Sequence, residues 1–230
     1  LLPLLIDEGI KDYRNKTIKD AKTLCKKLKL KLTIISYKTE FGYTLDQMLK
    51  ISKEKPCSLC GVLRRYLLNK YSRKLKATKL ATGHNLDDES QAIVMNQFRN
   101  NPEINARLGP IAGIKEDEMF VRRIKPFYLL SEKETTAYAF LHNFISEYNT
   151  CPYTHQSYRG DVRDMLNSFE LKYSGTKHAI IRSFLEILPL LKKKYSSIVP
   201  EIKSCKLCKE PCSQDICQCC ALIKKVKSKS

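Results

Sequence analysis

Short apolar strands alternate with amphipathic helical segments along the first 130 residues, and this order most constrains the fold. Apolar residues recur at helical spacing over Thr17–Leu30 and Cys57–Leu75, and a further helix begins near Leu86. Strands alternating with helices predict an α/β fold with a doubly wound parallel sheet. The predicted strands are Leu4–Ile6, Leu32–Tyr37, Lys79–Thr82 and Phe120–Ile124.

The chain after residue 130 is predicted to be helical. Pro189 lies inside the last helical pattern, and we expect it to kink or divide that helix. The first helix opens with the capping box Ser131–Glu134. The three predicted helices are Ser131–His142, Arg159–Tyr173 and Thr176–Tyr195.

Composition divides the chain into three regions. Residues 1–130 form the predicted α/β catalytic domain, and residues 131–200 form a helical extension. From Glu201 the sequence is rich in cysteine, lysine and polar residues, so residues 201–230 read as a small zinc-binding module with a basic tail. The run Leu1–Ile6 reads as the last part of a strand, and we expect an earlier segment, with part of the active site, to precede it.

Net charge and cysteine content indicate the kind of partner and the cellular compartment. Forty-two Lys and Arg against 24 Asp and Glu give a net charge of +18. Clustered cations favour nucleic acid as the partner, with an anionic membrane surface or a lysine-rich background as alternatives. No apolar run approaches the ~20 residues of a membrane span, and no signal peptide is visible. These features predict a cytoplasmic protein with no membrane association, whose cysteines bind metal rather than form disulfides.

Three cysteines stand apart from the cysteine-rich tail. Cys57 and Cys60 form a CxxC pair after Pro56, and Cys151 follows 91 residues after Cys60 (151 − 60). Three thiolates cannot close a tetrahedral zinc site alone, whereas a 4Fe-4S cluster held by three cysteines keeps one iron open. The alternative is an inert pair plus one buried cysteine. Cys25 reads as a small core residue of the first helix.

The tail carries a second cysteine pattern. Two CxxC pairs, Cys205–Cys208 and Cys217–Cys220, are separated by eight residues (209 to 216). Such pairs are typical of a structural zinc site, because each pair supplies two thiolates to one tetrahedral ion. Cys212 and Cys219 are extra, and Cys219 competes with its neighbour Cys220 for the ligand role. A tail held only by disulfides is the alternative.

A polar segment, Thr82–Glu89, follows the third predicted strand. Open α/β sheets bind ligands at this carboxyl end. Asp87 or Asp88 is expected either to bind Mg²⁺ and position nucleotide phosphates or to cap the following helix. His84 follows the turn residue Gly83. It is expected either to orient a phosphate or to hydrogen-bond within the turn.

Several segments together carry a family resemblance. The chain resembles the tRNA 2-thiouridine synthetases of the PP-loop (adenine-nucleotide α-hydrolase) superfamily, above all the archaeal and eukaryotic cytosolic wobble-uridine thiolation proteins. The resemblance spans almost the whole chain. The family's pyrophosphatase loop, Ser-Gly-Gly-Lys-Asp-Ser, has no counterpart here and is expected before Leu1, together with an amino-terminal zinc module. The matching segments are Asp7–Ile10, Cys57–Gly61, Thr82–Glu89, Cys151–Tyr153, Arg159–Arg163 and Leu166–Asn167.

The resemblance implies a PP-loop ATP-pyrophosphatase fold and four cofactors: a 4Fe-4S cluster, ATP, Mg²⁺ and Zn²⁺. It implies that ATP adenylates the uracil C2 oxygen before sulfur bound at the cluster is transferred. Arg64 would offset phosphate charge, with a solvated helix-face arginine as the alternative. The family spacing favours Cys220 over Cys219. The implied site residues are Cys57, Cys60 and Cys151 for the cluster, Asp88 and Arg64 for catalysis, Gly83, His84, Asp87 and Asp88 for the nucleotide, and Cys205, Cys208, Cys217 and Cys220 for zinc.

The implied partners are tRNA and a sulfur donor, either sulfide or a thiocarboxylated ubiquitin-like protein. The sequence does not identify the oligomeric state, and a homodimer is one possible assembly. The target base must leave its stack to reach the cluster. Three alternatives stay open: thiolation of the T-loop uridine, a nonenzymatic zinc-dependent RNA-binding protein, and an ATP-pyrophosphatase that transfers an amine instead of sulfur. The three isolated cysteines favour thiolation, because the last two alternatives do not need them.

Overall fold

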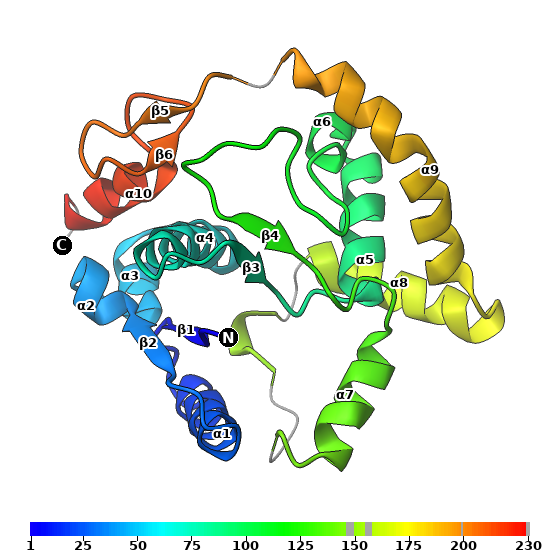
Figure 1. The fold of residues 1–230 in the computed structure, drawn as a ribbon, viewed down its shortest axis with the longest axis horizontal. Coiled ribbons are helices and arrows are strands. Elements are labelled where there is room, and N and C mark those ends of the chain that lie inside the picture. Colours follow the sequence, from blue (N-terminus) through cyan, green and yellow to red (C-terminus); the bar gives the residue numbers. More distant parts are fainter. Residues whose placement is uncertain (146–149, 155–157, 199, 229–230) are drawn as a thin grey trace.

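Two parallel strand pairs form the α/β part of the chain. The computed structural model describes residues 1–145, 150–154, 158–198 and 200–228 (Figure 1). In the first pair, Leu4 to Asp7 of one strand face Thr33 to Ser36 of the other, and the second pair aligns Lys79 with Arg122. The strands are β1 (Leu4–Asp7), β2 (Thr33–Ser36), β3 (Lys79–Ala81) and β4 (Arg122–Ile124).

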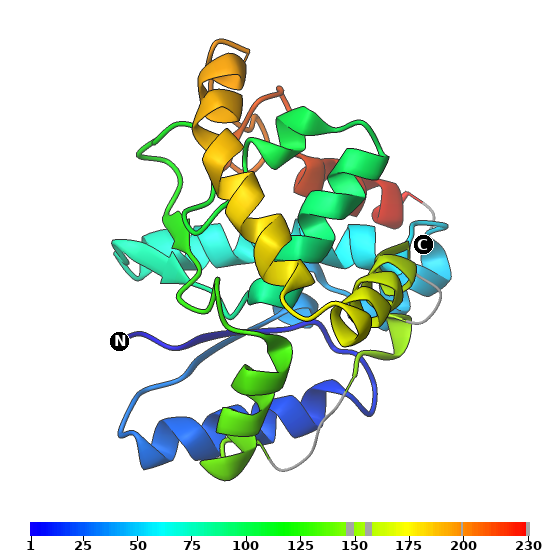
Figure 2. The same ribbon diagram turned by 90° about the vertical axis from the view of Figure 1, so that its right-hand side faces the viewer.

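Parallel pairing within each pair agrees with the predicted α/β fold class. The predicted doubly wound sheet is not continuous, since the described strands of one pair do not hydrogen-bond to those of the other. The first pair lies between two helices, α1 (Arg14–Lys27) and α4 (Pro56–Lys74), as Figures 1 and 2 both show. One helix on each face is the layering that the alternating sequence pattern predicts.

A helical layer surrounds α5 in the second half of the molecule. Helix α5 contacts α6, α8 and α9 (Figure 1). Helix α9 continues past Pro189, so the expected division is wrong; burial of Ile181, Phe184 and Leu188 offsets the hydrogen bond that proline removes. The helices are α5 (Leu86–Phe98), α6 (Pro102–Asn105), α7 (Glu132–Leu141), α8 (Tyr158–Lys172) and α9 (Thr176–Ser196).

The hydrophobic cores cut across the regions expected from composition. One core joins Tyr37 and Leu63 of the first half to Cys217 and Val226 of the tail. Another joins α5 and Tyr128 to the buried face of α9. The tail therefore packs against α4 rather than standing apart. Its elements are β5 (Lys203–Ser204), β6 (Pro211–Cys212) and α10 (Gln218–Lys227).

Short helices were absent from the prediction. The strand expected to reach Tyr37 ends at Ser36, because the Ser36 side chain caps the following helix by accepting from the Thr39 N–H. Two helices therefore occupy the polar stretch before α4, and they are α2 (Tyr37–Phe41) and α3 (Leu45–Ile51).

No described helix combines the length and the apolar composition that crossing a bilayer requires.

Candidate active site and metal centres

The CxxC pair lies in the first turns of α4. Pro56 opens the helix, where a missing N–H removes no intrahelical hydrogen bond. Cys57 is exposed, whereas Cys60 is only 9% exposed and packs beside Leu63 in the first core. The positive end of a helix dipole favours a thiolate at such a position. The start of α4 therefore presents one accessible sulfur and one buried sulfur.

Cys151 reaches α4 through a short turn in the helical half. The 3-10 turn η1 (Pro152–Thr154) follows Cys151 and packs against α4. Tyr153 anchors this turn, because its hydroxyl donates to Asp46 Oδ1 at 2.7 Å and its carbonyl oxygen lies 3.7 Å from Cys57 Sγ. Cys151 packs against the same core as Cys60. The chain thus brings the three predicted cysteines into one neighbourhood.

The three sulfurs do not make a compact single-ion group. Within the described parts of the chain, the group of metal-ligating side chains close enough to share one ion lies in the tail. A cluster of several iron and sulfide atoms holds its cysteine ligands farther apart than one ion does, so the looser arrangement suits a cluster better than zinc. Burial raises the pKa of the Cys60 thiol and also that of Cys151. A cation beside them therefore helps to keep these sulfurs ionised.

Arg64 supplies such a cation. Its Nη2 lies 3.4 Å from Cys60 Sγ, and its Nε donates to Glu8 Oε1 at 2.8 Å. Its Nε and Nη2 are both engaged although 46% of the side chain is exposed, so Arg64 combines an ordered contact with the solvent exposure that the alternative expected. The predicted role of Arg64 in offsetting phosphate charge stays a prediction.

The predicted nucleotide segment joins β3 to α5. Asp88 forms a reciprocal capping box with Asn85, so its carboxylate caps the helix as the structural alternative expected. Its other oxygen, Oδ1, accepts from Arg159 of α8 at 3.2 Å in an exposed ion pair. His84 Nδ1 lies 2.8 Å from Thr82 Oγ1. A Cβ atom at Gly83 would meet nothing within 4 Å, which leaves room for a ligand beside this turn.

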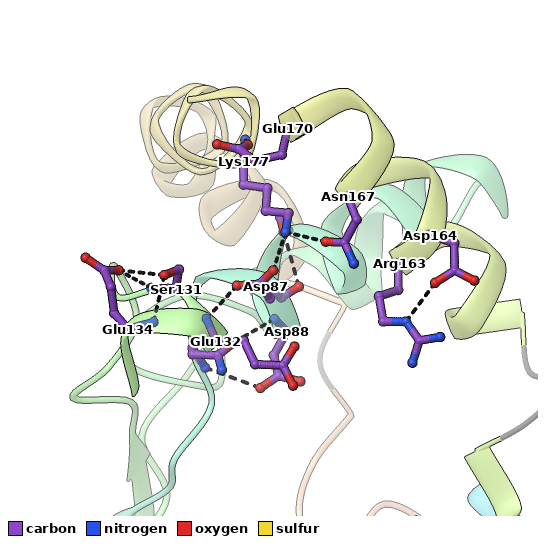
Figure 3. Close-up of polar contacts among 12 residues, drawn as sticks. Asp87, Asp88, Ser131, Glu132, Glu134, Arg163, Asp164, Asn167, Glu170 and Lys177 are labelled. Atoms are coloured by element: carbon purple, nitrogen blue, oxygen red, sulfur yellow. Dashed lines mark hydrogen bonds and ion pairs between the residues drawn. The ribbon is translucent and has the colours of Figure 1, made fainter. Parts of the chain in front are cut away.

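Both carboxylate oxygens of Asp87, the competing carboxylate, are held by donors from other helices. Its Oδ1 pairs with Lys177 at the start of α9, and its Oδ2 accepts from the Glu132 N–H of α7 at 2.7 Å (Figure 3). Lys177 also donates to Asn167 Oδ1 of α8 at 2.6 Å. Both Asp87 and Lys177 are buried. This carboxylate therefore ties α5, α7, α8 and α9 together, and Asp88 is the better placed of the two to face a ligand.

Sequence reasoning gave no role to Lys177. A signal was present, because Lys177 lies four residues before Ile181 and seven before Phe184 on the buried stripe of α9. A lysine on an apolar stripe is a candidate for a buried ion pair. Its partner lies 90 positions away in sequence, so the pattern alone could not identify Asp87.

Lys177→Met is expected to lower the free energy of unfolding by about 3–5 kcal/mol, because it leaves the Asp87 carboxylate buried without its cation. Chemical denaturation monitored by circular dichroism measures the change. Arg163→Ala is the matched control, since Arg163 pairs with Asp164 at an exposed site on α8 (Figure 3) and should change stability little. Equal stability of the Lys177→Met variant and the wild type would contradict this role.

The tail brings its four predicted cysteines together. The sulfurs of Cys205, Cys208, Cys217 and Cys220 all lie within 4.8 Å of one another. The Cys208 and Cys217 sulfurs are 3.7 Å apart, close to the roughly 3.8 Å that two 2.3 Å Zn–S bonds subtend in a tetrahedron. Burial would raise the pKa of Cys205, but backbone N–H donors, with Cys217 first among them, lower it to about 6. Burial raises the pKa of Cys217 to about 11 and also raises that of Cys220, so the case for a single-ion site rests on the spacing of the four sulfurs.

The two extra cysteines lie outside this group. Cys219 is buried in the core shared with α4. Cys212 Sγ donates to the Gln214 carbonyl oxygen at 2.8 Å. Cys219 and Cys220 therefore lie on different faces of α10, and Cys220 belongs to the four-sulfur group. CxxC spacing alone could not show which of the two neighbours is the ligand.

Comparison with known proteins identifies similar chains over nearly the full length. A probable sulfurtransferase of Methanocaldococcus jannaschii is 40% identical over 99% of this chain and 66% of its own length. The tRNA-5-methyluridine(54) 2-sulfurtransferase of Pyrococcus horikoshii is 35% identical over 94% of this chain and 68% of its own. The cytoplasmic tRNA 2-thiolation protein 1 of Dictyostelium discoideum is 32% identical over 99% and 62%. No family model matches.

A solved structure is similar in fold and sequence. The U34-tRNA thiolase NcsA from Methanococcus maripaludis, described with its 4Fe-4S cluster, is 31% identical, with a TM-score of 0.78 over 97% of this chain and 70% of that one. This chain spans between 62% and 70% of the length of these four proteins. The description of the thiolase names an iron-sulfur cluster and no zinc, so zinc in the tail stays a prediction.

Proposed function

This chain belongs to the family of tRNA 2-thiolation proteins, and from that premise we propose that it carries the sulfur-transfer site of a cytoplasmic, ATP-dependent tRNA uridine 2-sulfurtransferase. In the proposed reaction, ATP adenylates the uracil C2 oxygen with release of pyrophosphate. Sulfur then bonds to C2, the C2–O bond breaks, and AMP departs. The net charge of +18 suits tRNA as the polyanionic substrate.

The convergence of Cys57, Cys60 and Cys151 beside Arg64 carries the proposal. These residues fit a 4Fe-4S cluster, since they offer three thiolates, a looser spacing than the tail and a cation at the buried ligand. When bound, such a cluster supplies an open iron at which sulfur can be held. The chain's own residues exclude water from Cys60 by burial and hold Cys151 in place through Tyr153.

We assign the nucleotide to the turn between β3 and α5. Asp88 would hold Mg²⁺ and the phosphates through Oδ1, and the open space at Gly83 would admit the nucleotide. Arg159, which pairs with Asp88, lies eight residues after Cys151 (159 − 151), so the same stretch of chain serves both the cluster and the nucleotide segment. This connection would keep the adenylated base near the sulfur.

Asp88→Asn is expected to reduce ATP consumption and tRNA thiolation by the full-length protein by about 100-fold or more, with iron content unchanged. An asparagine amide oxygen can still accept from the Asn85 N–H, so the helix cap survives and only the charge is lost. ATP-to-AMP conversion and iron content are measured on the same sample. Asp164→Asn, which removes an exposed carboxylate of α8, is the control. Wild-type turnover in Asp88→Asn would contradict the role.

The tail is proposed to hold zinc rather than a second cluster. Its sulfur spacing matches one tetrahedral ion, and a cube of iron and sulfide would not fit between sulfurs that all lie within 4.8 Å of one another. The site would fix the tail beside α4, where Glu210 pairs with Arg73 of that helix at 3.2 Å and Lys225 pairs with Glu54, two residues before the helix, at 2.5 Å. This arrangement would present the lysines of α10 to tRNA.

We further propose that β1–β2 and β3–β4 are two parts of one doubly wound PP-loop sheet. Both pairs are parallel, and helices cover both faces of the first pair. The strand that would join the two pairs and the loop that would bind pyrophosphate stay predictions. The sulfur donor and a homodimer remain predictions.

Nucleoside analysis of tRNA tests the proposed function. The full-length protein is expressed in cells whose own thiolase gene is deleted, and digested tRNA is analysed by mass spectrometry. Reappearance of 2-thiouridine at the wobble position supports the primary proposal. Reappearance at the T-loop position would instead support the alternative of T-loop thiolation. No thiolated uridine at either position would overturn both.

A further inference from the structure

Glu8 is a fully buried carboxylate to which the proposed function gives no part. Its side chain is 0% exposed, and it lies directly after β1 between two arginines. Arg14 Nε lies 2.5 Å from Oε2, and Arg64 Nη2 lies 2.7 Å from Oε1. A buried carboxylate of this kind persists only where cations and hydrogen bonds replace its hydration. Two arginines on one carboxylate indicate that Glu8 organises them.

The backbone around Glu8 is fixed on both sides. The Gly9 N–H donates to Asp7 Oδ1 at 2.9 Å, and the Leu45 N–H donates to the Glu8 carbonyl oxygen at 2.8 Å. Gly9 has a φ of +70°, and a Cβ atom there would lie 2.6 Å from Thr44 Cγ2. Only glycine fits this turn, so the Asp-Glu-Gly sequence sets where the Glu8 side chain starts.

The two arginines differ in what else they touch. Arg14, the first residue of α1, points back to β1, where its Nη2 donates to the Ile6 carbonyl oxygen at 2.5 Å. Arg64 points to the cysteine site, with its Nη2 3.4 Å from Cys60 Sγ. The Arg64 side chain is 46% exposed, so without a tether its several rotamers would compete with this contact. Glu8 therefore selects the rotamer that faces the sulfur.

A second donor completes the surroundings of Cys60. The Tyr37 hydroxyl is buried, donates to the Cys60 carbonyl oxygen at 2.9 Å and lies 3.8 Å from Cys60 Sγ. Charges and hydrogen bonds at ligand sulfurs tune the reduction potential of iron-sulfur clusters. A guanidinium fixed at the sulfur stabilises the reduced, more negative state and so raises the potential.

We propose that Glu8 is a positioning residue that acts through Arg64, holding the guanidinium against Cys60 Sγ and thereby setting the electrostatics of the cysteine-bound cluster. The inference rests on the proposed function, because it requires the cluster at Cys57, Cys60 and Cys151. Glu8 lies 52 positions before Cys60 (60 − 8) and acts through Arg64 rather than by touching the cluster ligands or the nucleotide segment. Arg14 balances the second oxygen of Glu8 and points to the Ile6 carbonyl oxygen rather than to Cys60.

The test uses a double-mutant cycle on the full-length, anaerobically purified protein. Glu8→Asp keeps the charge but shortens the side chain by one methylene, which breaks the contact with Arg64. Arg64→Met removes the cation. Electron paramagnetic resonance during a redox titration measures the midpoint potential, and iron content is measured on the same samples. We expect a lower potential for each single variant than for the wild type, and no further decrease when Glu8→Asp is added to Arg64→Met.

Glu40→Asp is the matched control. Glu40 also pairs with α4, through Lys70 at 2.6 Å, but has no contact with Cys60, and its variant should keep the wild-type potential. If Glu8→Asp does not fold, Glu8→Gln serves instead, since it keeps the side-chain length but removes the charge that pairs with Arg64; a lowered potential supports the inference and an unchanged one overturns it.

The outcomes distinguish a failure of the proposed cluster site from a failure of the proposed role of Glu8. A wild-type protein without Cys60-dependent iron overturns the proposed cluster site. A wild-type protein with the cluster, whose potential is unchanged in Glu8→Asp, overturns the role of Glu8 alone. An equal decrease caused by Glu8→Asp with and without Arg64 would show that Glu8 does not act through that arginine, and would likewise overturn the inference.

Discussion

Cys151→Ala in the full-length protein is expected to remove the cluster iron and the 2-thiouridine product together. Cys151 is the ligand contributed by the helical half, and two cysteines of α4 cannot hold a 4Fe-4S cluster alone. The fold should survive, because Cys151 is half-buried in a short connection that Tyr153 anchors independently. Iron content and tRNA nucleoside analysis on one preparation measure both losses, each expected to fall about 100-fold or to background.

Cys25→Ala is the control for this prediction. Cys25 is a buried cysteine of α1 outside both cysteine groups, so its variant should keep iron and activity. A Cys151→Ala protein that retains its iron and thiolates tRNA at the wild-type rate would contradict the three-cysteine site, whatever the state of the tail.

Cys208→Ala is expected to release the tail metal and unfold residues 203–227. Structural zinc sites contribute about 10–16 kcal/mol of apparent binding free energy to folding, far more than the two short strands and one helix of the tail can replace. Removing one of four ligands also leaves Cys219 and Val226 of the tail without a fixed place in the first core. Zinc content and hydrogen exchange of the tail measure the effect.

Cys212→Ala is the matched change, because it removes a tail cysteine outside the four-sulfur group. It should keep zinc and slow exchange. Slow exchange of the tail in Cys208→Ala, with zinc still bound, would show that the ligand set is different from the one proposed.

Local patterns predicted local structure well. Helix α4 was predicted from Cys57 and begins one residue earlier, at Pro56, whereas α7 begins at Glu132 directly after Ser131, the N-cap of the predicted capping box. The same logic was available for α3, where Thr44 and Gln47 form a capping box. It was overlooked because seven residues give too short an apolar period to recognise.

Contacts between distant residues were beyond pattern reasoning. The tail sulfurs lie within 15 residues of one another (220 − 205), so their spacing alone predicts the group that the structure shows. The grouping of Cys57 with Cys151 was predicted because these cysteines stand apart from the tail, and the family resemblance supported it; no local pattern relates the two residues. The partners of Glu8 and Lys177 depend on how helices pack against strands, and no periodicity carries that information.

Two separate cysteine sites with different metals are the central feature proposed for this molecule, and anomalous scattering tests it most directly. Crystals of the anaerobically purified full-length protein are measured at the iron and zinc absorption edges. Iron density beside Cys57, Cys60 and Cys151, with zinc density among Cys205, Cys208, Cys217 and Cys220, is the predicted result. Iron density within the tail, or no metal beside Cys60, would contradict it.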